Sequence, residues 1–180
     1  MRKLSYKIAY CGISTALCLV AMFCTGIIPF SMYLMPVIAS ILLLFIKEEL
    51  GAKWAWLSFI AVSILSLILT PDWEAKLIFI FTIGWYPLLR DAFIKIKPRL
   101  FSFIVRIAIL NLTTAICYFV LIKVFGMTEL LDTGGVTVTV FIISTILIAE
   151  FFFIIFDFLV AKFSFSYKNI ISKRLRKRMK

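Results

Sequence analysis

Four polar side chains interrupt the two most C-terminal apolar runs of this chain, and they have the greatest capacity for chemistry. Arg106 and Asn111 lie in one run, and Glu150 and Asp157 lie in the next. An acidic side chain near the middle of a membrane span costs roughly 2.5 to 3.5 kcal/mol on translocon-based scales. Such residues are retained for a structural contact, a ligand or a proton.

The positions of these residues along the two runs place them in two pairs, each at a similar depth in the membrane. Arg106 and Asp157 lie at similar depth from the same membrane face, so antiparallel neighbours would form an intramembrane ion pair. The alternative is that both charges snorkel to the headgroups. Asn111 and Glu150 both lie near the middle of their runs. Their contact would be either a protonated carboxyl that joins two helices or a ligand or proton site, since burial raises a carboxyl pKa.

Aromatic and acidic residues also gather in the connections that we assign to the outside. They would form a mouth that combines stacking surface with negative charge. An aromatic belt with ordinary solvated acids is the alternative. The candidate ligand-binding residues are Tyr33, Trp73, Asn111 and Glu150. The residues considered for the mouth are Phe30, Tyr33, Asp72, Trp73, Glu74, Tyr118, Glu129 and Asp132.

Catalysis is not expected. The chain contains no histidine, which excludes Ser–His hydrolysis and zinc or haem ligation through imidazole. Glu48 and Glu49 precede Lys53 with a spacing similar to that of intramembrane proteases, but such a site needs histidine to activate water. The four cysteines form no C-x-x-C pair and are interpreted as small packing residues. We therefore expect no enzyme activity, no catalytic residue, no metal site and no cofactor.

The elements that must position these residues are membrane helices. Of 180 residues, 63% are hydrophobic and 16% are charged, whereas soluble domains average about 45–50% and about 25%. Apolar runs of about 20 residues suit transmembrane helices. The sequence predicts an all-α polytopic bundle of about six transmembrane helices, with one transmembrane domain over residues 1–162. The expected spans are about 8–28, 31–46, 52–69, 75–89, 100–122 and 137–161.

Basic residues indicate the orientation of these spans. The 20 Lys and Arg residues outnumber the 9 Asp and Glu residues, for a net charge of +11. With both termini in the cytoplasm, only Lys76 and Lys123 fall outside, as the positive-inside rule favours. The 163–180 segment reads as a basic amphipathic cytoplasmic tail that contacts anionic lipid headgroups. Nucleic acid is not an expected partner, and the cell membrane is the expected location.

Small residues line one face of the first expected helix. Ala9, Gly12 and Ala16 recur at helical spacing, and small residues allow two membrane helices to approach closely. The contact would be either within this protein's own bundle or with a helix of a separate membrane subunit.

The first helix also carries a resemblance to a known family. The run Lys7-Ile8-Ala9-Tyr10-Cys11-Gly12-Ile13-Ser14-Thr15-Ala16-Leu17, together with the basic termini and compact layout, resembles the substrate-binding S components of energy-coupling factor transporters. The stretch from Lys53 to Pro87 is similar to a group of small multi-pass bacterial membrane proteins. The S-component resemblance implies uptake of a vitamin-like small molecule. It also implies docking through the first helix onto a transmembrane coupling subunit driven by ATPases.

A structural role is the competing interpretation. Small rod-shape determining membrane proteins also have about six spans, and they organise a cell-envelope complex without a ligand cavity. A channel would require polar residues that repeat along several spans, and only Asn111, Thr113, Thr114 and Glu150 approach that pattern.

Overall fold

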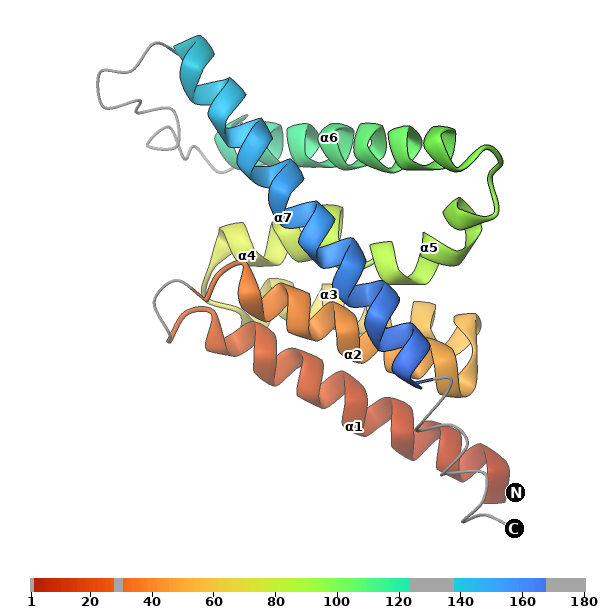
Figure 1. Ribbon diagram of the computed structural model, residues 1–180. Helices are drawn as coiled ribbons and strands as arrows, with labels where there is room; N and C mark the ends of the chain where they lie inside the picture. The colour runs from red at the N-terminus through yellow and green to blue at the C-terminus, as the bar shows by residue number, and fades with distance from the viewer. Residues whose placement is uncertain (1, 28–30, 124–137, 168–180) are drawn as a thin grey trace.

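The described part of the chain is helical. The computed structural model (Figure 1) describes residues 2–27, 31–123 and 138–167, and within these ranges no strand is present. The elements are α1 (Arg2–Cys24), α2 (Leu34–Leu50), α3 (Ala52–Leu69), α4 (Trp73–Ile78), the π-helix η1 (Phe79–Ile83), α5 (Tyr86–Ile94), α6 (Arg99–Lys123) and α7 (Val138–Ser166).

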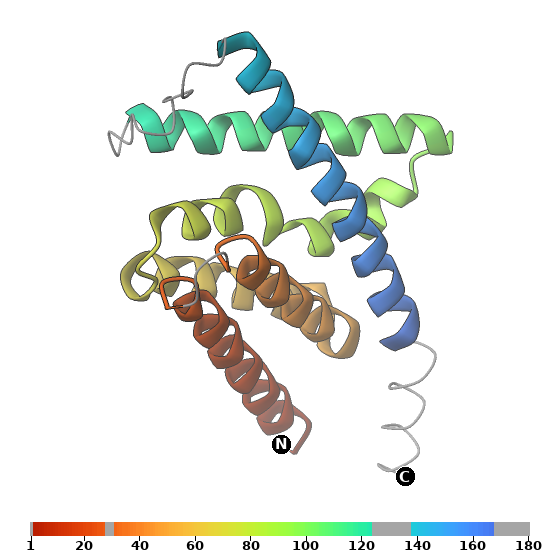
Figure 2. The ribbon, with the colours of Figure 1, turned by 60° about the vertical axis from the view of Figure 1, so that its left-hand side comes forward.

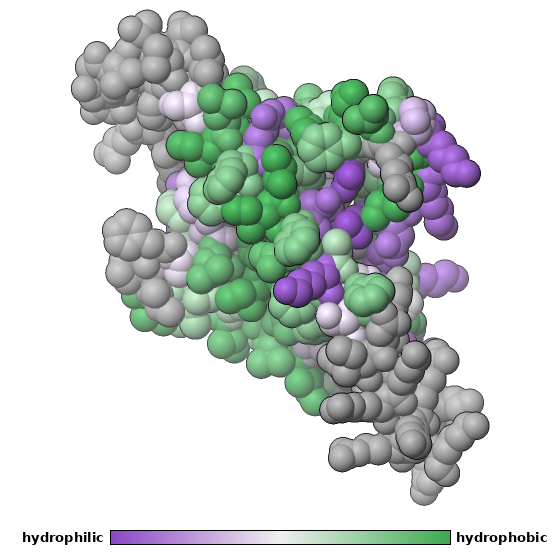
Figure 3. Space-filling model, in the orientation of Figure 1, coloured by the Kyte–Doolittle hydropathy of each residue, from purple (hydrophilic) through white to green (hydrophobic). Residues whose placement is uncertain are grey.

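Long apolar helices identify an integral membrane protein. Among the described residues, four helical stretches are long and apolar enough to cross a membrane: Leu4–Cys24, Ala52–Leu69, Trp73–Ile94 and Leu100–Lys123. The third combines α4, η1 and α5. Exposed surface is mostly apolar, and the green atoms of Figure 3 extend over most of the face in view. In a soluble protein such a surface would cause association, whereas in a membrane it faces lipid tails.

The helices form two groups that differ in how closely they pack. Helices α1, α2 and α3 contact one another along their lengths, and α4, η1 and α5 pack beside α2. Helix α6 lies against α4, η1 and α5, and α7 crosses obliquely over α2 (Figures 1 and 2). The closely packed group at the N-terminal half of the chain therefore supports the two later helices.

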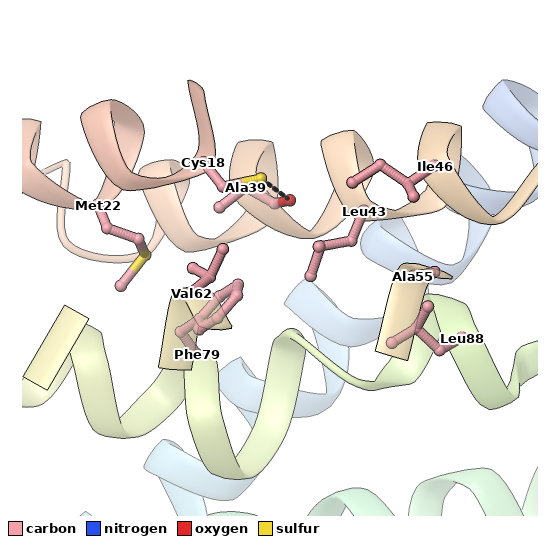
Figure 4. Packing of buried hydrophobic residues seen from close by; sticks show 9 residues of the cluster. All are labelled: Cys18, Met22, Ala39, Leu43, Ile46, Ala55, Val62, Phe79 and Leu88. Carbon is pink, nitrogen blue, oxygen red and sulfur yellow. Dashed lines mark hydrogen bonds between the residues drawn. The ribbon is translucent and has the colours of Figure 1, made fainter. Parts of the chain in front are cut away.

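The main apolar core lies inside the first group. Figure 4 shows side chains from α1, α2, α3, η1 and α5 converging on one region. Cys18 is fully buried there, and its thiol donates a hydrogen bond to the Ala39 carbonyl at 3.4 Å. This contact agrees with a packing role for the cysteine. The cluster contains Cys18, Met22, Ala39, Leu43, Ile46, Ala55, Val62, Phe79 and Leu88.

Helix α2 differs from the expected second span. It begins at Leu34 and continues through Lys47, Glu48 and Glu49 to Leu50, where Gly51 (φ +99°) ends it with a backbone conformation that favours glycine. Pro36 lies in the first turn, where no intrahelical partner for an N–H is lost. The helix thus continues four residues beyond residue 46, where the expected apolar span ends.

The reason is that this charged run has partners on other helices. The Lys47 ammonium lies 2.8 Å from Asp91 of α5. On α7, Ser164 donates to Glu48 at 2.7 Å, and just beyond it Tyr167 donates to Glu49 at 2.6 Å. Burial, followed by the hydrogen bond to Glu49, raises the pKa of the Tyr167 phenol, so it remains a donor.

Helix α7 also runs further than expected. It continues through Ala161 to Ser166, so the start of the segment interpreted as a separate tail is part of the same helix. Residues 168–180, which carry most of the predicted tail, lie outside the described residues.

The helical stretch Trp73–Ile94 is broken near its middle. The Gly84 N–H donates to the Phe79 carbonyl at 2.8 Å, five residues back, and the Trp85 indole donates to the Phe81 carbonyl at 2.6 Å. A Cβ on Gly84 would lie 2.6 Å from that Phe79 oxygen and 2.8 Å from the Phe59 ring. Glycine is therefore required where the π-helix passes into α5, and π-helical turns often occur at functional sites.

Candidate functional site

A polar cluster lies where α5, α6 and α7 meet. The Asp157 carboxylate on α7 accepts hydrogen bonds from the Tyr86 hydroxyl at 2.6 Å, from Arg90 Nε at 2.7 Å and from Arg106 Nη1 at 2.7 Å. Arg106 Nη1 is also 3.4 Å from the Tyr86 oxygen. We call Tyr86, Arg90, Arg106 and Asp157 the junction cluster.

The junction cluster is largely buried. The side chains of Arg90, Arg106 and Asp157 are 13%, 11% and 20% exposed. Charged hydrogen bonds of this length are stronger than neutral ones, and partial burial reduces their screening. The cluster thus holds α7 against α5 and α6 by specific polar contacts.

The sequence pattern identifies only half of this cluster. The structure brings Arg106 and Asp157 together at the distance of an ion pair, as their depth predicts. The pattern does not identify Tyr86 or Arg90 as site residues, and the structure places both on α5. A useful signal is present, because Tyr86 and Arg90 are four residues apart and so share a helix face.

Asn111 and Glu150 form a second contact between α6 and α7. The Asn111 amide donates to the Glu150 carboxylate at 3.2 Å, and both residues are half-buried. The structure places these two ligand-binding candidates together, but away from Tyr33 and Trp73, which lie at the start of α2 and of α4. The four candidates therefore belong to two separate places.

Tyr33 belongs to a second polar cluster, which is centred on Glu74. Tyr33 and Tyr118 both donate to the same Glu74 oxygen, at 3.0 and 3.3 Å. Asp72 caps α4 by accepting from the backbone N–H groups of Glu74 and Ala75 at 2.9 and 3.4 Å, which holds Glu74 in the first turn of the helix. Partial burial, followed by the nearby Tyr118 and Glu74, raises the pKa of the Tyr33 phenol, so it stays a hydrogen-bond donor.

Trp73 belongs to this place but has a neighbour of its own. The Lys76 ammonium lies 3.5 Å from the centre of the Trp73 ring and donates to the Leu67 carbonyl at 3.2 Å. Lys76 is only 2% exposed, so this cation–π contact is shielded from water. Of the other mouth residues, Phe30, Glu129 and Asp132 lie outside the described residues.

A groove of about 350 Å³ runs between α1 and α3. Gly12 and Ala16 line it from α1, and Trp54 and Ser58 line it from α3. A Cβ added to Gly12 would meet no atom within 4 Å. Ala9, next on the same face, is exposed as well. The full lining is Cys11, Gly12, Thr15, Ala16, Leu19, Trp54, Leu57, Ser58 and Ala61.

The groove concerns the small residues of α1, which we interpret as a contact either within the protein's own bundle or with a separate subunit. Within the described residues, Ala9, Gly12 and Ala16 are exposed, and Gly12 and Ala16 line a groove whose other side belongs to α3. No other side chain of the described residues lies within 4 Å of the position that a Gly12 Cβ would take.

Comparison of the chain with protein-family models, with curated proteins and with solved structures finds no match.

Proposed function

We propose that this integral membrane protein captures a small molecule for uptake and docks onto a separate transmembrane coupling subunit that is driven by ATPases. The observation that carries the proposal is the open groove between α1 and α3, whose lining includes Gly12 and Ala16. Small residues permit close backbone contact with a partner helix in lipid. An S component of an energy-coupling factor transporter requires such a docking surface.

Two further features support a transport role. The stretch Trp73–Ile94 is a broken helix, and discontinuous membrane helices commonly border substrate sites in transporters. Glu74, Tyr33 and Tyr118 form a polar and aromatic site at the end of the bundle opposite the α5–α6 connection. In this proposal there are six spans, both termini are cytoplasmic, and the Glu74 site faces outward to meet the vitamin-like substrate.

Partner isolation tests the proposal. The full chain with an affinity tag is purified from its native membrane, and co-isolated subunits are identified by mass spectrometry. We expect ATPase subunits with the wild type, and at least a tenfold loss of them for Gly12→Leu, because the added isobutyl group fills the groove. Leu17→Trp adds bulk to an exposed position of α1 outside the groove and should retain the partners.

A structural or assembly role in the cell envelope is the second candidate. One observation favours it: the space bordered by Tyr86, Arg106 and Phe153, on the inner side of α6, has no room for a water molecule. A protein that organises a complex needs no internal cavity. If envelope-synthesis proteins co-purify with the wild type and ATPases do not, and if Gly12→Leu loses those envelope-synthesis proteins, the structural role would replace the transport proposal.

A further inference from the structure

The junction cluster carries unbalanced positive charge. Two guanidinium groups, on Arg90 and Arg106, face the single carboxylate of Asp157, which leaves one positive charge. The adjacent Lys47–Asp91 pair is neutral and does not offset it. An uncompensated charge at 11–13% side-chain exposure is costly unless an anion lies nearby.

The cluster also has hydrogen-bond donors to spare. Arg90 uses Nε for Asp157. Across residues 2–27, 31–123 and 138–167, its two terminal nitrogens have no hydrogen-bond partner, and neither is among the buried polar atoms that lack one. They therefore lie at the surface of the protein, where a ligand can contact them.

The surroundings indicate the depth of a lipid headgroup. Arg90 lies one turn before the end of α5 at Ile94. The exposed Lys95 and Lys97 follow in the connection to α6, and purple atoms gather over this connection on the right of Figure 3. Basic pockets between helices at this depth bind anionic headgroups.

The helices that carry the cluster also expose large apolar side chains. Leu100 and Phe103 on α6 are 77% and 38% exposed, and Phe158, next to Asp157 on α7, is 65% exposed. A soluble anion would have no use for this apolar surface, whereas the acyl chains of a lipid would cover it. Spare guanidinium donors on α5, together with exposed apolar side chains on α6 and α7, match an amphipathic ligand.

We propose that the junction cluster binds the phosphate group of an anionic phospholipid, with Arg90 as the principal ligand. The guanidinium plane offers paired N–H donors that match phosphate oxygens. Asp157 holds Arg90 through Nε, which leaves the terminal nitrogens directed to the lipid phosphate. This site is distinct from the predicted contacts of the basic tail, and it does not depend on the proposed transport role.

Native mass spectrometry of the full chain in detergent tests the proposal, with phosphatidylglycerol and phosphatidylcholine as probes. We expect the wild type to retain one phosphatidylglycerol and to bind it at least tenfold more tightly than Arg90→Gln does. Lys53→Gln removes the same charge from an exposed position at the start of α3 and should change binding less than twofold. Equal loss in both variants, or no loss in Arg90→Gln, would overturn the proposal.

Two controls keep the result interpretable. Arg90→Gln leaves Arg106 and Asp157 as a neutral pair, so the variant should still fold, and its melting temperature in phosphatidylcholine should fall much less than that of Asp157→Ala. If it does not fold, Arg90→Lys keeps the charge without the paired donors and should still bind phosphatidylglycerol more weakly than the wild type does. If millimolar inorganic phosphate displaces the lipid, the site recognises free phosphate and not a phospholipid, and the proposal is wrong.

Discussion

The Asn111 amide and the Glu150 carboxylate contact each other across α6 and α7 at 3.2 Å. Both residues lie near the middle of their helices, Arg99–Lys123 and Val138–Ser166. The contact is therefore a hydrogen bond between two helices that otherwise pack loosely against each other.

Replacement of Glu150 distinguishes its hydrogen bond from its charge. We expect Glu150→Gln to unfold at the same denaturant concentration as the wild type, because the amide keeps an acceptor for Asn111. Glu150→Leu should lose about 1 kcal/mol, the scale of interhelical hydrogen bonds in membranes. Unfolding of the purified protein in mixed micelles measures both. Equal stability of the Leu and Gln variants would contradict a structural contact, and loss of uptake in a folded Gln variant would assign a role to the charge.

Removal of Asp157 should cost far more than removal of one of its partners. Asp157→Ala leaves two guanidinium groups without a counter-charge, so we expect about 3 kcal/mol of lost stability. Arg90→Gln leaves a neutral pair and should cost about 1 kcal/mol. Asp91→Asn is the matched control, since its carboxylate is 48% exposed and pairs of that kind contribute less than about 1 kcal/mol. The order of the three melting temperatures checks the prediction, which a milder effect of Asp157→Ala than of Arg90→Gln would contradict.

Two glycines should respond in opposite ways to the same methyl group. At Gly84 the new Cβ would overlap the Phe79 carbonyl oxygen and the Phe59 ring, so Gly84→Ala should cost about 1–3 kcal/mol. At Gly12 the position is open, and Gly12→Ala should leave stability unchanged or raise it by a few tenths of a kcal/mol. Thermal unfolding of both variants in one detergent makes the comparison.

Labelling with an impermeant thiol reagent in intact cells tests the proposed orientation. After the native cysteines are replaced, single cysteines at positions 97 and 173 should be protected, and one at position 133 should be labelled. Labelling at both 97 and 173 would reverse the proposed topology. Cys18 and Cys117 are buried, so alanine is a suitable replacement because it leaves only a small void.

The sequence predicts the fold class because membrane helices depend on the composition of short, continuous stretches of the chain. Apolar runs and the scarcity of charge predict membrane helices, and the described residues are helical with long apolar stretches. Depth along a run is equally local, which is why the sequence alone suffices to match Arg106 with Asp157 and Asn111 with Glu150.

Rotation around a helix is harder to predict when its periodicity is broken. The π-helical turn ending at Gly84 changes the angular register of everything that follows, so the directions of Tyr86 and Arg90 cannot be extrapolated from α4. The partners of Lys47, Glu48 and Glu49 lie on α5, on α7 and just beyond α7. A charged run without visible partners resembles a helix end, and only tertiary contacts show that the helix continues.

The position of Asp157 in the chain has a consequence for biogenesis. A ribosome delivers α5 and α6 to the membrane before α7, so Arg90 and Arg106 are made before the carboxylate that pairs with them. The core shared by α1, α2, α3, η1 and α5 requires nothing from the last helix. Arrival of α7 is therefore the step that brings the one carboxylate of the junction cluster to its two guanidinium groups, and a chain truncated before residue 157 would present two arginines without it to quality-control proteases.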